Sequence, residues 1–227
     1  IANAGEKLAA GGPYTGEGNG IEWTFLISEN SEAILGIGDS TAAISNKTEG
    51  AIVVPETLGG CPVTVINDAA FIGCRSVTSI TFPSTIVSIN DGAFCHCDNL
   101  ESFNIPESVK KLGGGLIHGN RKLEKIFIPA SVESIDGYAF WEGFALKEIE
   151  VDKGSPNYTS VGGVLYNKNV TLLIYCPGAL TEMTLPASVT TVSEDSCLSG
   201  CCQIANFYVE EGNACFKSVD GILYTKD

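Results

Sequence analysis

The sequence predicts a β-rich solenoid made of similar coils stacked on one another, for three reasons. Segments of the chain match one another when they are shifted by 23 residues. The matching positions are mostly apolar, so they form columns that stacked coils bury against their neighbours. The 227 residues include 26 Gly and 9 Pro but a single Met, which favours β structure with many turns over a helix bundle.

Four copies of the repeat follow one another between residues 63 and 151. They read VTVINDAAFIGCRSVTSITFPST (63–85), IVSINDGAFCHCDNLESFNIPES (86–108), VKKLGGGLIHGNRKLEKIFIPAS (109–131) and VESIDGYAFWEGFALKEIEV (132–151). The apolar columns are Ile66, Ile89, Leu112 and Ile135; Phe71, Phe94, Ile117 and Phe140; Val77, Leu100, Leu123 and Leu146; Ile80, Phe103, Ile126 and Ile149; Phe82, Ile105, Ile128 and Val151. A period of about 20–29 residues with an LxxLxL core predicts a leucine-rich-repeat solenoid.

Each coil is expected to contain two extended stretches joined by turns. Leu100-x-x-Phe103-x-Ile105 predicts a strand with alternate residues inward, which ends at Pro106 because proline cannot donate to the ladder. The Ser-Val-x-x-Ile that follows predicts a second, shorter strand. Asn90-Asp91 is typical of a turn or cap. The Ala-Phe after it is expected on a short helical or irregular turn on the outer side of the coil.

The flanks of the tandem copies predict a cap and two insertions. Residues 18–38 contain two apolar stretches separated by Ser28–Glu32, which indicates a β-hairpin covering the open end of the stack. Residues 215–227, CFKSVDGILYTKD, match YTSVGGVLYNKN at an offset of 58 and stop where a partner strand is expected, so we expect the natural protein to continue beyond this fragment. The expected order of segments is a flexible lead-in (1–20), an N-terminal β cap with the first partial coil (21–60), tandem 23-residue repeats (61–151), an inserted β-hairpin island (152–179), a further repeat (180–211) and a truncated second island (212–227). The fifth copy of the repeat starts at Val189 and continues with Val192 and Cys197.

The repeat unit resembles that of the BspA-type leucine-rich repeat family, which runs roughly IPxSVxxIGxxAFxxCxxLxxI. The resemblance lies in IPESVKKLGGGLIHGNRKLEKIFIP and its neighbours from Leu58 to Val151, and in LPASVTTVSEDSCLSGCCQIANFYV, about two thirds of the chain. Cys74 and Cys97 fit the cysteine column, whereas Asn120, Gly143 and Gly200 depart from it. The resemblance implies a cell-surface protein of host-associated bacteria or protist parasites, with adhesion to host or matrix components as its role.

Cys95, His96 and Cys97 are the most chemically suggestive run of the sequence. Cys97 occupies the core column of Cys74, and adjacent turn residues point in different directions, so these three side chains are not expected to meet. Stacking brings Cys95 near His118, and His96 can approach them, but this set supplies at most three ligands, whereas structural zinc takes four. We therefore expect no metal and no cofactor, with Cys95, His96 and His118 as the weak candidates for a metal site.

The remaining motifs favour structural roles. Stacking also places Cys74 and Cys97 within disulfide range, but parallel side chains favour two free thiols. Leu112-Gly-Gly-Gly115 lacks the rest of a phosphate loop and lies in the turn column of Asn90. Neither histidine belongs to a recognisable nucleophile elbow. The sequence therefore predicts a protein that is not an enzyme.

Outward-facing strand residues are the expected binding surface. They include Phe127 and Tyr208, aromatic where the pattern permits polar residues, and an exposed ring on a strand is a candidate contact. The alternative is that these rings pack against the island or a neighbouring molecule. The full candidate set is Phe127, Tyr208, Asn104, Lys125, Glu148 and Glu150.

These observations predict a secreted or surface-attached protein that binds a protein or glycan through its exposed sheet face. The net charge of −14 argues against a nucleic-acid partner, and no apolar run reaches the ~20 residues of a membrane span. Two alternatives remain open. One is a structural spacer that displays another domain, and the other is a thiol- or metal-based sensor or enzyme.

Overall fold

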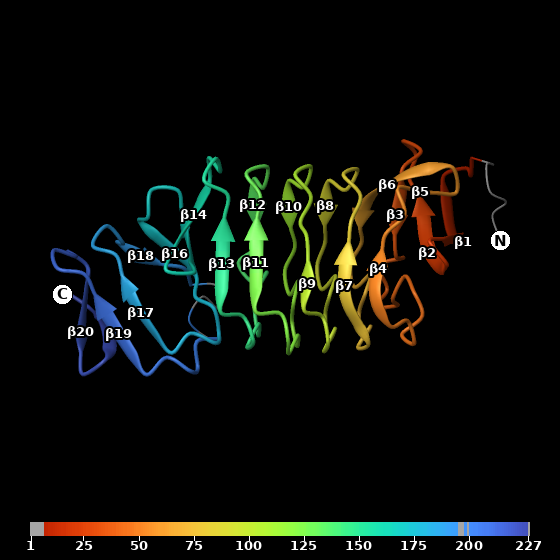
Figure 1. Cartoon of the computed structure of the whole chain (residues 1–227). Helices are drawn as coiled ribbons and strands as arrows, with labels where there is room; N and C mark the ends of the chain where they lie inside the picture. Colours follow the sequence, from red (N-terminus) through yellow and green to blue (C-terminus); the bar gives the residue numbers. More distant parts are fainter. Residues whose placement is uncertain (1–6, 195–197, 199, 227) are drawn as a thin grey trace.

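The computed structural model describes residues 7–194, 198 and 200–226, which form a β-solenoid. The coils lie side by side from the N-terminal end to the C-terminal end (Figure 1). The connections on the outer side are irregular turns, and no described residue is helical, so the helical alternative for these turns is not realised. Accordingly, no helix of membrane-spanning length and apolarity occurs in the part of the chain that the structure describes.

The LxxLxL segments form one side of the solenoid, here called the strand face. Its parallel strands are β4 (Gly50–Val53), β7 (Val77–Thr81) and β9 (Ser102–Phe103), then β11 (Lys125–Ile128) and β13 (Glu148–Val151), and finally β17 (Glu182–Leu185) and β19 (Asn206–Val209). Strands β4, β7, β9, β11 and β13 follow one another across this side in Figure 1. Inward residues are buried and outward ones exposed, as the alternating pattern of β11 and β13 shows.

A second sheet runs along the back of the coils. In spatial order it contains β1 (Gly11–Gly18), β2 (Ile21–Ile27), β3 (Ala33–Leu35), β6 (Cys61–Ile66), β8 (Ser88–Ile89), β10 (Lys111–Leu112) and β12 (Ser134–Ile135), with β5 (Thr57–Leu58) paired to β6. Its register confirms the predicted stacking, since Ile66 pairs with Ile89, and Leu112 pairs with both Ile89 and Ile135.

The apolar columns form a continuous core between the two sheets. Ile66, Ile89 and Leu112 are fully buried, and Ile135 is partly buried against them. The Phe71 and Phe94 rings stack with centroids 5.7 Å apart. Each coil thus covers the apolar side chains of its neighbour, which is why a single coil has no core of its own.

The Asn-Asp turns repeat their hydrogen bonds from coil to coil. Asn90 Nδ2 donates to Asn67 Oδ1 at 3.4 Å, and the Asp91 amide donates to Asp68 Oδ1 at 3.2 Å. In the next coil, the Gly114 amide donates to Asp91 Oδ1 at 2.9 Å. A Cβ on Gly113 would lie 2.4 Å from Asp91 Oδ1, so Gly113 permits a close approach between neighbouring turns.

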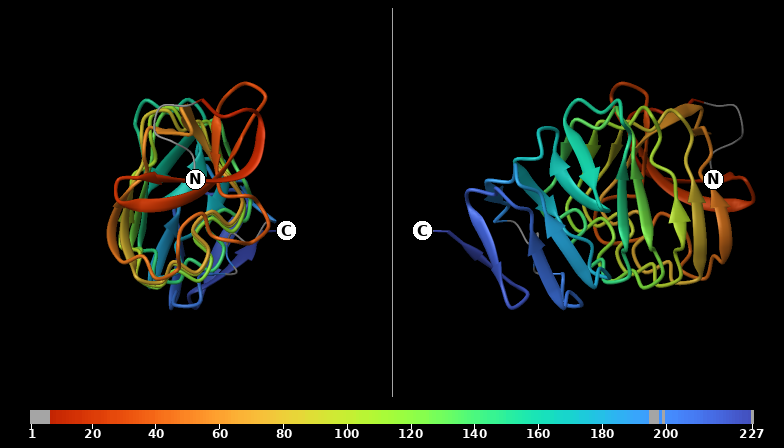
Figure 2. Two further views of the ribbon diagram at one scale, coloured as in Figure 1. Left: turned by 90° about the vertical axis from the view of Figure 1, so that its right-hand side faces the viewer. Right: turned by 60° about the vertical axis from the view of Figure 1, so that its left-hand side comes forward.

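The N-terminal cap confirms the predicted hairpin and corrects the predicted lead-in. β2 pairs antiparallel with β3, joining Phe25 to Leu35 as expected. Residues 11–18, expected within a flexible lead-in, instead form β1 on the outer edge of β2. Its glycines permit close packing, because a Cβ on Gly16 would lie 3.2 Å from the Phe25 ring, and Gly18 accepts a 2.8 Å hydrogen bond from Trp23 Nε1. These strands lie across the end of the stack in the end-on view of Figure 2.

The two islands dock in the same way, 58 residues apart. The first contains β14 (Tyr158–Val161), β15 (Val164–Asn167) and β16 (Leu172–Tyr175), and β16 pairs in parallel with β18 (Thr191–Val192). The second contains β20 (Phe216–Val219) and β21 (Ile222–Thr225). The Ile149 amide donates to the Gly163 carbonyl at 2.8 Å, and the Phe207 amide donates to the Gly221 carbonyl at 2.8 Å. Each hairpin tip therefore covers the last strand of the sheet before it. Cys197, expected in a core column, lies outside the described residues.

Candidate functional site

Phe127 is the most prominent apolar side chain in the middle of the strand face. It lies on β11, is 40% exposed, and is flanked in the ladder by Glu150 of β13. Its inward neighbours Ile126 and Ile128 are buried, so the alternation of the strand holds its ring outward. A large ring held on a rigid sheet supplies contact area at little conformational cost.

Lys125 connects the two strands beside this ring. Its Nζ lies 2.7 Å from Glu150 and 3.3 Å from Glu148. Hydrogen bonds to Glu150 and then Glu148 raise the pKa of Lys125 above its ordinary value. All three side chains are exposed, so these ion pairs order the surface around Phe127 more than they stabilise the fold.

Asn104 belongs to this surface, whereas Tyr208 lies apart from it. Asn104 follows β9, next to β11, and its Oδ1 accepts a 3.3 Å hydrogen bond from the Phe82 amide. Tyr208 is 48% exposed on β19, where it pairs with Thr184 in the separate β17–β19 sheet. The structure thus brings together Phe127, Lys125, Glu148 and Glu150 on two paired strands, and it places Asn104 on the neighbouring coil.

Basic residues near this surface are paired with acids from neighbouring coils. Asp98 lies between two arginines one coil away on either side, 3.6 Å from Arg75 and 3.8 Å from Arg121. Further pairs join Lys110 to Glu133, Lys122 to Glu101 and Lys147 to Glu124. The positive charge is therefore dispersed among carboxylates.

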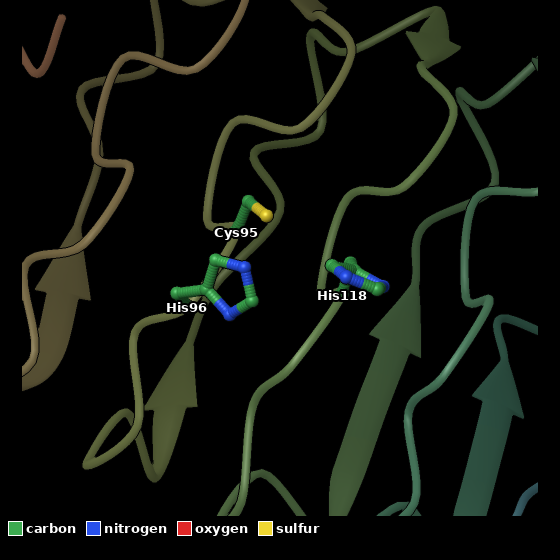
Figure 3. A group of neighbouring side chains, drawn as sticks. All are labelled: Cys95, His96 and His118. Carbon is green, nitrogen blue, oxygen red and sulfur yellow. The ribbon is translucent and has the colours of Figure 1, made fainter. Parts of the chain in front are cut away.

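Cys95, His96 and His118 meet on the turns between the two sheets. One potential ligand atom from each lies within 4.8 Å of the others. Figure 3 shows Cys95 and His96 on one turn and His118 on the next, with the side chains facing a common space. The His96 amide donates to the His118 carbonyl at 2.8 Å, which fixes the two turns relative to each other.

Cys97 does not join this group, as predicted. Its thiol is buried in the core and donates to the Phe71 carbonyl at 3.0 Å. Cys74 and Cys97 are free thiols. Burial raises the pKa of Cys74 to about 12 and raises the pKa of Cys97 further above its ordinary range.

Two neighbours of the cluster escaped the sequence analysis. Glu142 Oε2 lies 3.2 Å from His118 Nδ1, although the pair lacks the angle of a hydrogen bond. Gly119 lies directly beneath the His96 ring, because a Cβ there would fall 2.4 Å from His96 Nδ1. The sequence signal for both residues was their spacing, because Gly73, His96, Gly119 and Glu142 follow one another at intervals of 23 residues. In the structure all four have positive φ.

Stacked coils whose short parallel strands pair from one coil to the next define a leucine-rich-repeat solenoid. Comparison with known proteins shows the family to which this chain belongs. Residues 64–177 match the BspA type leucine rich repeat region in six copies. The chain therefore belongs to the BspA-type leucine-rich repeat proteins. A search of curated proteins finds no match.

Solved structures of similar proteins include three bacterial examples. A leucine-rich repeat protein from Eubacterium ventriosum is 24% identical, with a TM-score of 0.55 over 85% of this chain and 58% of that one. The pneumococcal vaccine antigen PcpA is 20% identical, with a TM-score of 0.50 over 89% of this chain and 66% of that one. A leucine rich cell surface protein from Faecalibacterium prausnitzii is 18% identical, with a TM-score of 0.38 over 87% and 76%. This chain spans 58% and 66% of the lengths of the first two proteins, whose similarity shows a shared fold.

Proposed function

We propose that this chain acts as a non-enzymatic, secreted or cell-surface repeat protein that binds a protein or glycan through its strand face. The observation that carries the proposal is the exposed Phe127 ring, set among Lys125, Glu148 and Glu150 on two paired strands. An aromatic anchor surrounded by ordered polar groups is the arrangement typical of binding hot spots.

The family and the fold support this proposal. Solenoids offer a long, rigid surface whose outward residues vary without disturbing the core. One protein of similar fold is a vaccine antigen of pneumococcus, which is consistent with a surface location for this chain. The acidic charge of −14 favours protein or glycan ligands over nucleic acid.

The test is binding of the purified chain to an array of host matrix proteins and glycans, followed by titration of each retained ligand. Phe127→Ala is expected to weaken binding by about 10-fold or more, as truncation of a hot-spot side chain does. Tyr138→Ala is the matched control, since Tyr138 is also a half-exposed aromatic residue, at 48%, but lies on a turn outside the strand face. The proposal is rejected, in favour of a spacer role, if Phe127→Ala binds every retained ligand as tightly as the unaltered chain does. It is also rejected if the array retains no ligand.

A further inference from the structure

We propose that Cys95, His96 and His118 form a zinc site with three protein ligands, positioned by Glu142. Thiolate and imidazole are the ligands that zinc prefers in proteins. The proposal is independent of ligand binding at the strand face, because the cluster lies on the turns that join the two sheets.

The spacing of the three side chains suits one zinc ion. Bonds of about 2.0–2.1 Å to nitrogen and about 2.3 Å to sulfur place neighbouring ligands of tetrahedral zinc about 3.3–3.6 Å apart. The ligand atoms here lie within 4.8 Å of one another, so side-chain rotations that move these atoms by about 1 Å bring them to the zinc geometry. His118 is partly buried and Cys95 is half-buried, which limits competition from water.

The ring of His118 is held in place from two sides. The Trp141 indole stacks on it with centroids 4.8 Å apart and planes at 15°. Glu142 Oε2 lies 3.2 Å from Nδ1, so a small rotation of either side chain lets the carboxylate accept a hydrogen bond from Nδ1–H, which leaves Nε2 to the metal. The negative charge of Glu142 beside the cluster also favours a bound dication.

The backbone directs His96 towards the cluster. His96 has φ of 56°, the left-handed conformation that Gly73, Gly119 and Glu142 share at the same position of their coils, and this turn geometry sets the direction of its side chain. Its ring occupies the space above Gly119, which only a glycine leaves free. The turn geometry of the repeat and the glycine beneath the ring therefore leave His96 free to lie beside His118.

A pocket beside the cluster leaves room for a fourth ligand. His96, Gly119, Asn120 and Glu142 are among the residues that line this cavity of about 400 Å³. Asn120 is only 2% exposed, and its Nδ2 has no hydrogen-bond partner among the described residues. The cavity leaves space beside His96 for a water or hydroxide as the fourth ligand.

The direct test is titration of the chelator-treated full chain with Zn²⁺ against a chromophoric competitor. We expect one zinc bound per chain. Loss of an outer-shell partner typically weakens metal binding by about 10–100-fold, so Glu142→Gln is expected to lower the zinc affinity by that factor. Cys95→Ser and His118→Ala remove a ligand and are expected to lower the zinc affinity further. Co²⁺ in place of zinc is expected to give a thiolate charge-transfer band, and Cys95→Ser is expected to abolish this band. Cys202→Ser, which changes an exposed cysteine, is the control in which the band is expected to remain.

Two glycines of the same column separate metal binding from folding. Gly119 and Gly73 have similar φ values of 76° and 69°, but a Cβ on Gly73 meets nothing within 4 Å. Gly119→Ala is therefore expected to weaken zinc binding by displacing the His96 ring, whereas Gly73→Ala carries the same backbone strain and leaves zinc affinity unchanged. Three results would overturn the proposal. The first is equal zinc affinity of the two glycine variants, the second is stoichiometric zinc binding that survives both Cys95→Ser and His118→Ala, and the third is the absence of zinc binding to the unaltered chain.

Discussion

At the scale of single residues, the side of the coil on which a side chain lies, inward or outward, decides its role. Phe94 and Phe127 are the same residue type in neighbouring coils, yet Phe94 is fully buried and Phe127 is 40% exposed. Phe94 occupies a core column on a turn, whereas Phe127 occupies an outward position of β11. We therefore expect one to contribute to stability and the other to binding.

Substitution of the two phenylalanines tests this division. Phe94→Ala removes a fully buried ring that stacks on Phe71, so it is expected to lower the free energy of unfolding by about 3–5 kcal/mol. Phe127→Ala is expected to change it by no more than about 0.5 kcal/mol, as surface substitutions usually do. Denaturant unfolding of both variants measures the difference. Similar losses in both would show that Phe127 also packs in a core.

Buried thiols give a second prediction at this scale. An unfolded thiol has a pKa of about 8.5, whereas Cys74 in the fold has a pKa of about 12. The stabilisation from the protonated thiol is therefore complete below about pH 8.5 and is lost as the pH rises towards 12. Above pH 9, the free energy of unfolding is expected to fall more steeply than in Cys74→Ala, by up to about 1.4 kcal/mol per pH unit.

Alkylation at pH 8 provides an independent readout of the same burial. Exposed Cys202 is expected to react with iodoacetamide in the folded protein, and Cys74 only after unfolding. Rapid modification of Cys74 in the native state would contradict its placement in the core.

The cysteine and histidine residues show how far residue-level prediction reached. Column arithmetic alone placed Cys97 in the core and Cys95 near His118, because both follow from the 23-residue offset. It did not anticipate Glu142 beside His118, since the approach of these side chains depends on their rotamers rather than on their columns. The glycines one repeat before and after His96, Gly73 and Gly119, were the sequence signal that His96 adopts a left-handed conformation.

At the scale of elements, the first island joins two cores. Along β15, Leu165 packs in the core of the tandem repeats, whereas Val164 and Tyr166 pack in the core of the C-terminal coils. A strand buried on both faces reads as a continuous apolar run, which VLY is. The island therefore connects the two halves of the solenoid rather than hanging outside it.

Tyr175 on β16 offers a test of this docking. Its hydroxyl donates a 2.6 Å hydrogen bond to the buried Phe140 carbonyl. Tyr175→Phe removes this donor, and because the Phe140 carbonyl keeps its 3.0 Å hydrogen bond from the Gly143 amide, the expected destabilisation is about 0.5–1.5 kcal/mol. Tyr224→Phe, at a residue 46% exposed on β21, is the control with little expected change. An equal effect of the two substitutions on the unfolding midpoint would argue against the docked island.

The hairpins were predictable and the first strand was not. Turn residues between apolar stretches marked β2–β3 and β15–β16, since both signals are local in the sequence. β1 lacks such a pattern, and it is a strand because β2 offers it an edge and because the Phe25 ring lies against Gly16. Tertiary contact decided this element.

At the scale of the whole molecule, the offset of 23 residues becomes a distance of one strand spacing. Hydrogen bonds between coils, such as Asn90 to Asn67, and the parallel pairing of Ile66 with Ile89 repeat this relation along the stack. Stability in such an array resides in contacts between nearest neighbours. The candidate binding surface and the proposed zinc site both depend on it, because each is assembled from residues of adjacent coils.

Nuclear Overhauser contacts between methyl groups along the first apolar column test this stacking most directly. We expect contacts between Ile66 and Ile89, between Ile89 and Leu112, and between Leu112 and Ile135, because their strands pair one strand spacing apart. Contacts between Ile66 and Ile135 should be absent. If residues one repeat apart show no contact, the coils are not stacked in this register, and both proposed sites lose their basis.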